Sequence, residues 1–437
     1  MEPIRLGLIG FGVVGAGVGA ILRNNGPALA ARVGRPLSLI HVAVRDLNKK
    51  RPALPEGARL TGDPFEVVND PSVDIVIEVM GGESPAFELC SKAVANGKHF
   101  VTANKLLLAL RGEEVYRAVE VAGVELGFEA AVAGAVPVIR ALRDALAADQ
   151  VEQTRGIVNG TGNYILSRMT DERVTFAEAL KGAQELGYAE ADPTLDVEGI
   201  DSAHKIAILA ALAFETPVDF SAVYTEGITR LTPEDIIMAG EFGYRVKLLA
   251  IARRVDGQVD LRVHPAMIPA RQFIANVNGP FNAVEITSRA AGANMLVGRG
   301  AGSGPTASAV MGDVVDIARN IVKGGAGKRY PMSAPVAARR RLPARPISAL
   351  VTEYYLRFTV PDRPGVLAEL AGALGRNGIS ISSMIQRGRQ ENEPVSVVML
   401  THKAREADLD KALAEIANSG LCAQPTMRVR IVNDERA

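Results

Sequence analysis

Arg5-Leu6-Gly7-Leu8-Ile9-Gly10-Phe11-Gly12-Val13-Val14-Gly15 joins an apolar strand to a helix through three spaced glycines. The first glycine permits a tight turn, the second lets the backbone approach a pyrophosphate, and the third lets helix and strand pack closely. The amino end of the following helix then faces the phosphates. A GxGxxG pattern alone is weak evidence, but this strand–turn–helix context favours a dinucleotide site formed by Gly10 through Gly15.

The residues up to about 130 continue this alternation of short apolar strands and helical periods. The predicted strands are Arg5–Ile9, Leu39–Val44, Asp74–Val79, His99–Thr102 and Val124–Phe128, and the predicted helices are Val13–Arg23, Pro64–Val68, Pro85–Asn96 and Lys105–Val121. Such alternation predicts a parallel sheet that is covered on both faces. The fold class is therefore α/β, with a Rossmann-type doubly wound sheet.

From residue 134 the pattern changes to a mixed α+β domain. The predicted helices are Val138–Ala147, a segment that starts with the capping box Thr175–Glu178 and ends before Gly187, and Val197–Phe214. The predicted strands are Glu152–Val158, Val259–Met267, Phe281–Thr287 and Asn294–Val297. A last helix, Gly312–Ile321, is predicted to return to the first domain.

Residues 323–346 hold seven Lys or Arg, no acid, and several Gly and Pro. They are either an anion-binding arm or a solvated linker, and the composition favours the linker because it cannot form a core. The elements predicted beyond it run in the order βαββαβ, which is typical of a ferredoxin-like domain. The predicted divisions are 1–133 with 308–322, 134–307, a linker at 323–350, and 351–437.

Charge and cysteine content exclude several classes of protein. The 437 residues contain 49 Lys+Arg and 49 Asp+Glu, so no net charge attracts nucleic acid or anionic lipid. Two cysteines, Cys90 and Cys422, are too few for a disulfide framework or a cysteine metal site. The chain shows no secretory leader and no run of 18 uncharged apolar residues, so we expect a cytoplasmic protein without a membrane partner.

The end of the second predicted strand bears on the choice of dinucleotide. It reads Ala43-Val44-Arg45-Asp46. An acidic residue at this tip would bind the ribose diol of NAD, whereas an arginine would meet the additional phosphate of NADP. Arg45 comes first and favours NADP, with NAD also open; the alternative is that these are solvated loop charges.

One helix combines acids and a lysine. In the predicted helix Val197–Phe214, Asp201 and Lys205 lie at i and i+4, within contact on one face. The residues after Lys205 are apolar, so the lysine lies beside a core and is a candidate for proton transfer. The alternative is an ordinary structural ion pair.

Two further segments are candidates for substrate contacts. Thr102 and Lys105 follow a predicted strand at the carboxyl edge of the sheet, where ligands of doubly wound folds collect. Asn159-Gly160-Thr161-Gly162-Asn163 is a polar turn before a helix, suited either to binding a carboxylate or to plain helix capping. Glu129 follows the last strand of the first domain, but one acidic residue is weak evidence for a metal.

Several blocks in order resemble the homoserine dehydrogenase family, in its bacterial form with a C-terminal ACT domain and no fused kinase. The blocks are Gly10–Gly15, Gly81–Pro85, Gly97–Lys105, Ile157–Thr161, Gly187–Pro193, Gly199–Lys205, Gly300–Gly302 and Pro305-Thr306. The resemblance implies reversible, NAD(P)H-dependent reduction of L-aspartate 4-semialdehyde to L-homoserine. That reaction belongs to threonine, methionine and isoleucine biosynthesis.

The resemblance also implies roles for individual residues. Lys205 is implied as proton donor and Lys105 as the second catalytic lysine, near the cofactor. The implied substrate residues are Glu190, Asp201, Asn159, Gly160, Thr161 and Asp196; further cofactor contacts are Thr102, Gly187 and Gly302; and a sodium ion is implied at Glu129, Val132, Gly134 and Val136. Gly162 departs from the family pattern, which has threonine there, so a hydroxyl contact is in doubt.

The C-terminal domain resembles an ACT domain through Pro361-Asp362-Arg363-Pro364-Gly365-Val366-Leu367. ACT domains commonly bind amino acids at paired interfaces, which implies feedback inhibition by threonine and a homodimer or homotetramer. The alternative is that the domain serves only in oligomerisation. Coupling would need two states of different threonine affinity.

Two other functions remain as alternatives. An aldehyde dehydrogenase that forms a thioester needs a cysteine nucleophile beside a base. Cys90 lies inside an apolar helical run and Cys422 in the distal domain, which disfavours this chemistry. A non-catalytic amino-acid sensor would retain the nucleotide fold and tolerate loss of Lys105 and Lys205.

Overall fold

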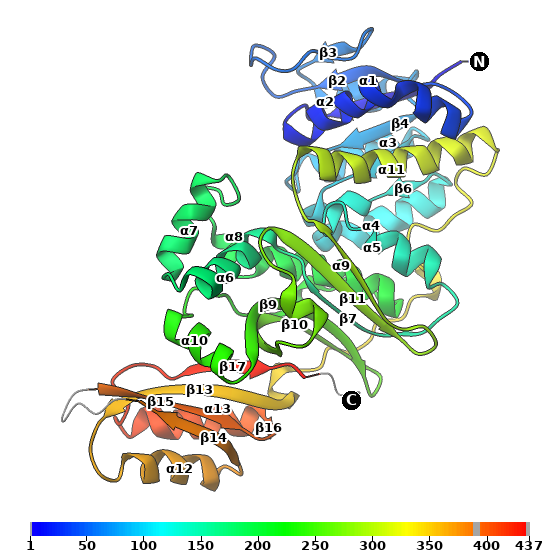
Figure 1. Ribbon diagram of the computed structural model, residues 1–437. Coiled ribbons are helices and arrows are strands. Elements are labelled where there is room, and N and C mark those ends of the chain that lie inside the picture. The colour runs from blue at the N-terminus through cyan, green and yellow to red at the C-terminus, as the bar shows by residue number, and fades with distance from the viewer. Residues whose placement is uncertain (1, 388–393, 434–437) are drawn as a thin grey trace.

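The computed structural model describes residues 2–387 and 394–433, so parts of the predicted C-terminal domain, 388–393 and 434–437, lie outside the described residues. Figure 1 shows three regions in a row, with the N-terminal sheet at one end, a mixed region in the middle and the C-terminal region at the other end. No helix in the described part of the chain has the length and apolar character needed to cross a membrane.

The N-terminal sheet is parallel and has the strand order β3-β2-β1-β4-β5-β6. Its strands are β1 (Ile4–Ile9), β2 (Leu37–Ala43), β3 (Arg59–Thr61), β4 (Ile75–Glu78), β5 (His99–Thr102) and β6 (Leu126–Gly127). The order reverses between β1 and β4, and ligands of such sheets bind where the order reverses, beyond the carboxyl ends of the strands.

Helices cover both faces of this sheet, as the sequence predicts. Side chains of α1 (Val13–Val33) and α11 (Ser303–Val322) share one core cluster with β1, β2 and β4. The other face is covered by α2 (Pro64–Asn69), α3 (Ala86–Ala95) and α4 (Lys105–Ala122). The Rossmann-type α/β prediction is confirmed, and α11 lies beside α1 although it follows the middle region in sequence (Figure 1).

A second, mixed sheet forms the middle of the molecule. Its strand order is β12-β11-β7-β9-β10-β17-β13-β15-β14, with β8 beside β10 and β16 beside β13. The strands of the middle region are β7 (Val151–Ile157), β8 (Tyr224–Thr225), β9 (Tyr244–Val255), β10 (Gln258–Pro269), β11 (Phe281–Ser288) and β12 (Gly292–Arg299). The helices are α5 (Val138–Arg140), α6 (Gly160–Glu172), α7 (Phe176–Glu185), α8 (Thr194–Val197), α9 (Ile200–Phe214) and α10 (Pro233–Glu241).

Several predicted boundaries are wrong. The strand β9 and the helix α10 were not predicted, and α1 continues to Val33, well past Arg23. The predicted helix Val197–Phe214 is interrupted, because Gly199 adopts a left-handed conformation with φ 81° and separates α8 from α9. The predicted helix Val138–Ala147 changes from α5 to a π-helix at Ala141–Ala145, and α11 begins at Ser303 instead of Gly312.

The C-terminal region has the predicted βαββαβ order, with one additional strand of two residues, β16, before the second helix. Its elements are β13 (Val351–Pro361), α12 (Val366–Arg376), β14 (Ile381–Gln386), β15 (Pro394–Thr401), β16 (Ala404–Arg405), α13 (Glu406–Asn418) and β17 (Met427–Ile431). Its sheet is continuous with the middle sheet, because β17 pairs in parallel with β10. The basic segment 323–346 is not a fully solvated linker: Met332 is buried, and buried Arg339 bonds Glu113 of α4 and the carbonyl of Thr216.

Candidate active site

The glycine turn after β1 has the geometry needed for a phosphate group. Gly10 has φ 98°, and a Cβ on Gly15 would lie 2.1 Å from the Gly10 carbonyl oxygen, so only glycine fits the third position. A Cβ on Gly12 would meet no atom within 4 Å, so the backbone there faces open space. The turn leads into α1, whose N-terminal N–H groups favour an anion. The chain therefore fits a dinucleotide pyrophosphate at this turn.

The other predicted cofactor residues lie at different distances from the turn. Gly302 precedes α11, and the adjacent Ser303 donates its hydroxyl to the carbonyl of Val13 at 2.7 Å, so Gly302 is brought to the turn. Arg45 is exposed two residues beyond β2. Gly187 is exposed with φ 73° in the loop after α7. Phe11, which lies within the glycine turn, is buried against α1.

The two predicted catalytic lysines share one carboxylate. Lys205 Nζ donates to Asp201 Oδ2 at 2.7 Å and to the Val158 carbonyl at 2.7 Å. Lys105 Nζ, at the first position of α4, lies 3.0 Å from Asp201 Oδ1. The predicted i,i+4 contact is confirmed, and the contact between Lys105 and Asp201 joins the N-terminal sheet region to the middle region. The Lys205 side chain is 12% exposed and that of Lys105 is 39% exposed, so the second is the more open to a ligand.

Charges within this cluster shift its pKa values. Burial alone would raise the pKa of Asp201, but the ammonium groups of Lys205 and Lys105 lower it well below its usual range. The charge of Asp201 raises the pKa of Lys105 despite partial burial. Burial, with a smaller contribution from Asp201, raises the pKa of Asp196. Asp201 and Lys105 are therefore both charged at neutral pH.

The polar turn before α6 supports the same acids. Asn159 caps α6 by accepting from Gly162 N, while its Nδ2 donates to Asp196 Oδ1 at 2.7 Å and to Asp201 Oδ2 at 2.9 Å. Gly162 thus supplies a backbone N–H to the cap, so the helix-capping interpretation of the turn is confirmed, and the capping side chain also joins two acids. Both Asp201 oxygens are engaged, so Asp201 has little capacity left for a substrate ammonium group.

Three predicted substrate residues lie around this centre. Gly160 is the first residue of α6, and the Thr161 hydroxyl donates to the Tyr188 carbonyl at 2.6 Å, which ties the 186–193 loop to α6. Glu190 is exposed in that loop, and its charge acts on Lys105. Of the acids in the loop and α8, Glu190 and Asp196 are therefore available to face a cationic group of a ligand.

A buried carboxylate that sequence reasoning missed lies next to Thr102. Glu78, at the end of β4, is fully buried and accepts the Thr102 hydroxyl at 2.7 Å. The Thr102 hydroxyl in turn accepts from Asn104 N, so it is occupied inside the protein. The signal was present in the sequence, because a single acid ends an otherwise apolar strand at the carboxyl edge of the sheet.

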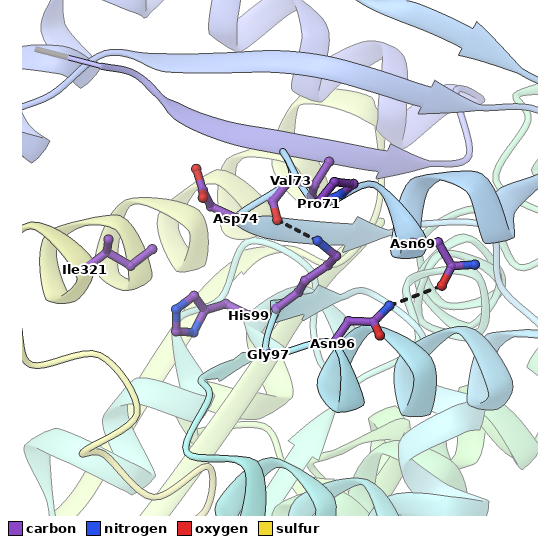
Figure 2. Close-up of a pocket in the computed structure, with 9 residues that line it drawn as sticks. Asn69, Pro71, Val73, Asp74, Asn96, Gly97, His99 and Ile321 are labelled. Atoms are coloured by element: carbon purple, nitrogen blue, oxygen red, sulfur yellow. Dashed lines mark hydrogen bonds between the residues drawn. The ribbon is translucent and has the colours of Figure 1, made fainter.

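One cavity and both cysteines lie outside this cluster. The cavity, of about 550 Å³, is lined by residues such as Asn69, Asp74, Asn96 and His99, at the amino end of β5 and opposite the glycine turn (Figure 2). Cys90 is buried in α3, and burial raises the pKa of its thiol, as it does for half-buried Cys422. Neither thiol has the exposed thiolate character that covalent catalysis requires.

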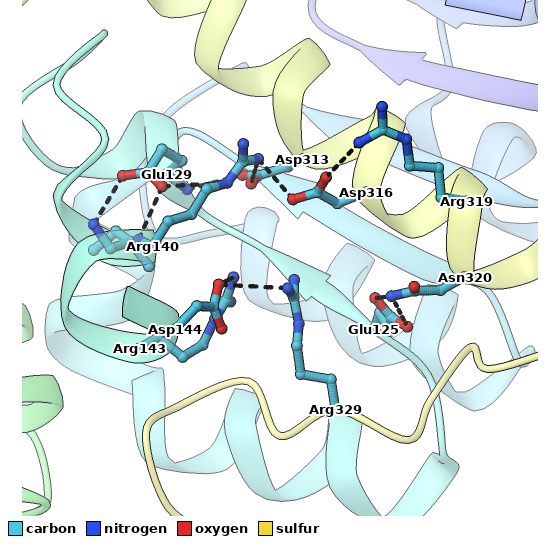
Figure 3. A network of polar contacts seen from close by, with 11 residues as sticks. Glu125, Glu129, Arg140, Arg143, Asp144, Asp313, Asp316, Arg319, Asn320 and Arg329 are labelled. Carbon is cyan, nitrogen blue, oxygen red and sulfur yellow. Dashed lines mark hydrogen bonds and ion pairs between the residues drawn. The ribbon is translucent and has the colours of Figure 1, made fainter. Parts of the chain in front are cut away.

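Glu129, the one acidic residue predicted to bind sodium, accepts hydrogen bonds from the protein itself. The Glu129 carboxylate accepts the backbone N–H groups of Ile139 and Arg140, at 2.8 and 3.1 Å (Figure 3). Arg140 also bonds Asp313 of α11, and burial together with Asp313 raises the pKa of Glu129 to about 7. The carboxylate thus caps a helix start, and this donor set fits a sodium ligand poorly. Within the described ranges no three or more His, Cys, Asp or Glu are grouped to hold a metal ion.

The cluster combines the groups needed for reduction of a carbonyl. Addition of hydride to a carbonyl carbon builds negative charge on the oxygen, and a nearby ammonium group both stabilises this charge and supplies a proton. Lys105 and Lys205 are such groups, fixed by one buried carboxylate. Glu190 and Asp196 are acids placed where they could pair with a cationic group of a ligand.

Comparisons with known proteins give one consistent family. A model described as "Homoserine dehydrogenase, NAD binding domain" matches residues 10–129, one described as "Homoserine dehydrogenase" matches 137–315, and one described as "ACT domain" matches 354–420. The homoserine dehydrogenase of Pseudomonas aeruginosa is 43% identical, with 99% of each chain covered. The structure of a homoserine dehydrogenase from Thiobacillus denitrificans is similar with a TM-score of 0.94 and 47% identity, with 99% of each chain covered. That from Staphylococcus aureus gives a TM-score of 0.76 at 30% identity, again with 99% of each chain covered.

Proposed function

The chain belongs to the homoserine dehydrogenase family, and we propose that Lys205 and Lys105, held by Asp201, carry out its proton chemistry. Its activity is that of an NAD(P)-dependent oxidoreductase acting on a CH–OH group, which interconverts L-aspartate 4-semialdehyde and L-homoserine. The observation that carries the assignment of the residues is the carboxylate of Asp201 shared by both lysines.

Each residue of the cluster then has a distinct task. When bound, NAD(P)H supplies the hydride that reaches the aldehyde carbon. Lys205 Nζ, held between Asp201 and the Val158 carbonyl, gives its proton to the new alkoxide. Lys105, which is more exposed and has a raised pKa, stabilises the developing charge on that oxygen. In the reverse direction Lys205 takes the proton of the alcohol.

The substrate's two ends require opposite partners. We propose that Glu190 and Asp196 hold the ammonium group, because the oxygens of Asp201 are engaged by the lysines and Asn159. The α-carboxylate is proposed to lie at the amino end of α6, at Gly160 and Thr161, where helix N–H groups favour an anion.

An assay with purified protein tests the proposed function directly. Reduction of aspartate semialdehyde is measured with NADPH and NADH in turn, with and without threonine. Alkylation of the thiols should leave the rate unchanged, because Cys90 is buried and Cys422 lies in the C-terminal region. Loss of the rate on alkylation would instead favour the thioester mechanism.

The glycine turn gives a prediction with two separable readouts. Gly15→Ala should distort the turn and lower stability by about 1–3 kcal/mol, because its Cβ would overlap the Gly10 carbonyl. Gly12→Ala should leave stability unchanged, since its Cβ meets nothing within 4 Å, yet weaken the cofactor about tenfold or more by filling the space of the pyrophosphate. Thermal denaturation and titration of NADPH fluorescence measure the two effects. Unchanged NADPH affinity in Gly12→Ala would place the cofactor elsewhere.

We propose NADP as the preferred cofactor, because Arg45 is exposed beyond β2 where the adenosine ribose of such folds lies. Loss of one charged hydrogen bond costs about 1.5–3 kcal/mol. Arg45→Ala should therefore raise KM for NADPH about tenfold or more and leave KM for NADH unchanged. Lys49→Ala, in the same exposed loop, is the matched control. Equal effects on both cofactors would contradict the assignment of Arg45.

A sodium ion stays a prediction for the carbonyl oxygens of Val132, Gly134 and Val136. The Glu129 carboxylate already accepts two backbone N–H groups at the start of α5, and the Val136 carbonyl accepts from Val138 N at 2.8 Å. No step of the mechanism above depends on the ion. The proposed homodimer or homotetramer is likewise a prediction, which sedimentation of the full chain measures.

We further propose that threonine binds the ACT domain and inhibits the enzyme. Support comes from the contacts that join this domain to the substrate acids. Arg430 of β17 donates to Glu226 at 2.7 Å, and two residues further Ile228 N donates to the carbonyl of Val197 in α8. Asp196 lies in the same short helix, so movement of β17 would reach it through few contacts.

A further inference from the structure

Glu78 occupies a particular place in the N-terminal sheet. It ends β4, where it pairs in register with Ile9 of β1 on one side and Thr102 of β5 on the other. This is the point at which the strand order reverses, next to the glycine turn. A Cβ on Gly10 would lie 3.2 Å from Met80 N, so the residues after Glu78 touch the turn itself.

The Glu78 carboxylate ties two loops together. Its Oε1 accepts from Met80 N at 2.8 Å and Gly81 N at 3.1 Å, which fixes the loop after β4. Its Oε2 accepts from the Thr102 hydroxyl at 2.7 Å, and that hydroxyl accepts from Asn104 N at 2.9 Å in the loop after β5. Both carboxylate oxygens therefore hold backbone or hydroxyl groups at the carboxyl edge of the sheet.

Asn104 closes this network and begins α4. Its Nδ2 donates to the Gly82 carbonyl at 2.5 Å, and its Oδ1 caps α4 by accepting from Leu107 N. Lys105 is the next residue, and its ammonium group reaches Asp201 in the middle region. The position of Lys105 at the start of α4 is thus fixed by a network of hydrogen bonds that begins at Glu78.

A buried charge is costly unless it is satisfied. Over residues 2–387 and 394–433 Glu78 forms no ion pair, and three hydrogen bonds satisfy it instead. A carboxylate kept in such a place at the edge of an active site suggests a role other than stability alone. We propose that Glu78 is a positioning residue that acts, through Thr102 and Asn104, on Lys105.

The inference rests on the proposed role of Lys105, and a double-mutant cycle tests both separately. Glu78→Gln and Thr102→Val should each lower kcat roughly 10- to 100-fold, because small displacements of a catalytic group carry such losses, with the NADPH dissociation constant unchanged. In a Lys105→Ala background neither substitution should lower kcat further, because they act through the missing lysine. Thr102→Ser, which retains the hydroxyl, should restore most of the rate lost in Thr102→Val.

Thr61 offers a matched control. It ends β3 as Thr102 ends β5, and its hydroxyl likewise accepts a backbone N–H two residues on, but the helix that follows carries no catalytic lysine. Thr61→Val should leave kcat unchanged. Additive losses in the Lys105→Ala background, or an unchanged kcat in both Glu78→Gln and Thr102→Val, would overturn the inference about Glu78. An unchanged kcat in Lys105→Ala alone would instead refute the role proposed for that lysine.

Discussion

Lys205→Ala is expected to reduce kcat by roughly 10² or more in both directions, in the range of lost acid–base assistance. Lys205 donates to the Val158 carbonyl and to Asp201, and neither group can supply a proton to the alkoxide in its place. Lys105 would still neutralise Asp201, so the buried carboxylate keeps one cation and the fold should survive. NADPH affinity should be unchanged.

The measurement combines steady-state kinetics with titration of NADPH fluorescence. Lys181→Ala is the control, because the Lys181 side chain is 79% exposed on α7 and its ion pair with Glu185 is long, at 3.9 Å. Its kcat should match that of the unmodified protein. If Lys205→Ala kept its turnover, the residue would be part of a structural ion pair, and the non-catalytic sensor interpretation would regain support.

The local half of this site could be predicted from sequence. The spacing of Asp201 and Lys205 fixes their contact once the segment is helical, and the glycine turn follows from three glycines in a strand–turn–helix context. The helical segment itself was predicted too long, because the sequence does not reveal that Gly199 adopts a left-handed conformation. Local patterns therefore predict the contact between Asp201 and Lys205 and the glycine turn, but not the exact ends of the helices.

The other half depends on contacts between distant segments. Lys105 and Asp201 lie in different regions, and their ion pair arises only when α4 and α9 pack together. The family resemblance assigned Asp201 to the substrate ammonium group, and the contacts of its oxygens with Lys205, Lys105 and Asn159 disfavour that role. The position of Glu78 at the end of an apolar strand is visible in the sequence, but its partners are not, since its donors come from the loop after β4 and from Thr102 at the end of β5.

Strand pairing within the second, mixed sheet could also not be predicted from the sequence. The strand β9 is a nearly continuous buried run, a pattern that does not distinguish strand from helix. The parallel pairing of β17 with β10 joins the ACT domain to the middle region, and no local pattern specifies the register between such remote strands. The partners of the charged residues on these strands can be identified only in the folded chain.

Arg430→Met is expected to destabilise the protein by about 3–5 kcal/mol, because it leaves the buried Glu406 without its main partner. Arg430 and Glu406 are each 1% exposed, and Arg430 also bonds Glu226 and the Tyr224 hydroxyl of the middle region. The buried Arg430 therefore joins the ACT domain to the middle region through its ion pair with the partly exposed Glu226. The same substitution should weaken inhibition by threonine, if the proposed path through Glu226 carries it.

Chemical denaturation followed by circular dichroism measures the loss of stability, and the threonine response is read in the same assay as the activity. Arg387→Met is the matched control: it removes another Arg–Glu pair between the same two regions, but Arg387 is 63% exposed and its pair with Glu241 is worth about 0–1 kcal/mol. Replacing Glu406 by leucine in the Arg430→Met chain should recover part of the stability, since the buried carboxylate that has lost Arg430, and keeps Arg428 and the Tyr354 hydroxyl, is then removed. Equal losses in Arg430→Met and Arg387→Met would show that burial of the Arg430 cluster adds nothing to the docking of the ACT domain.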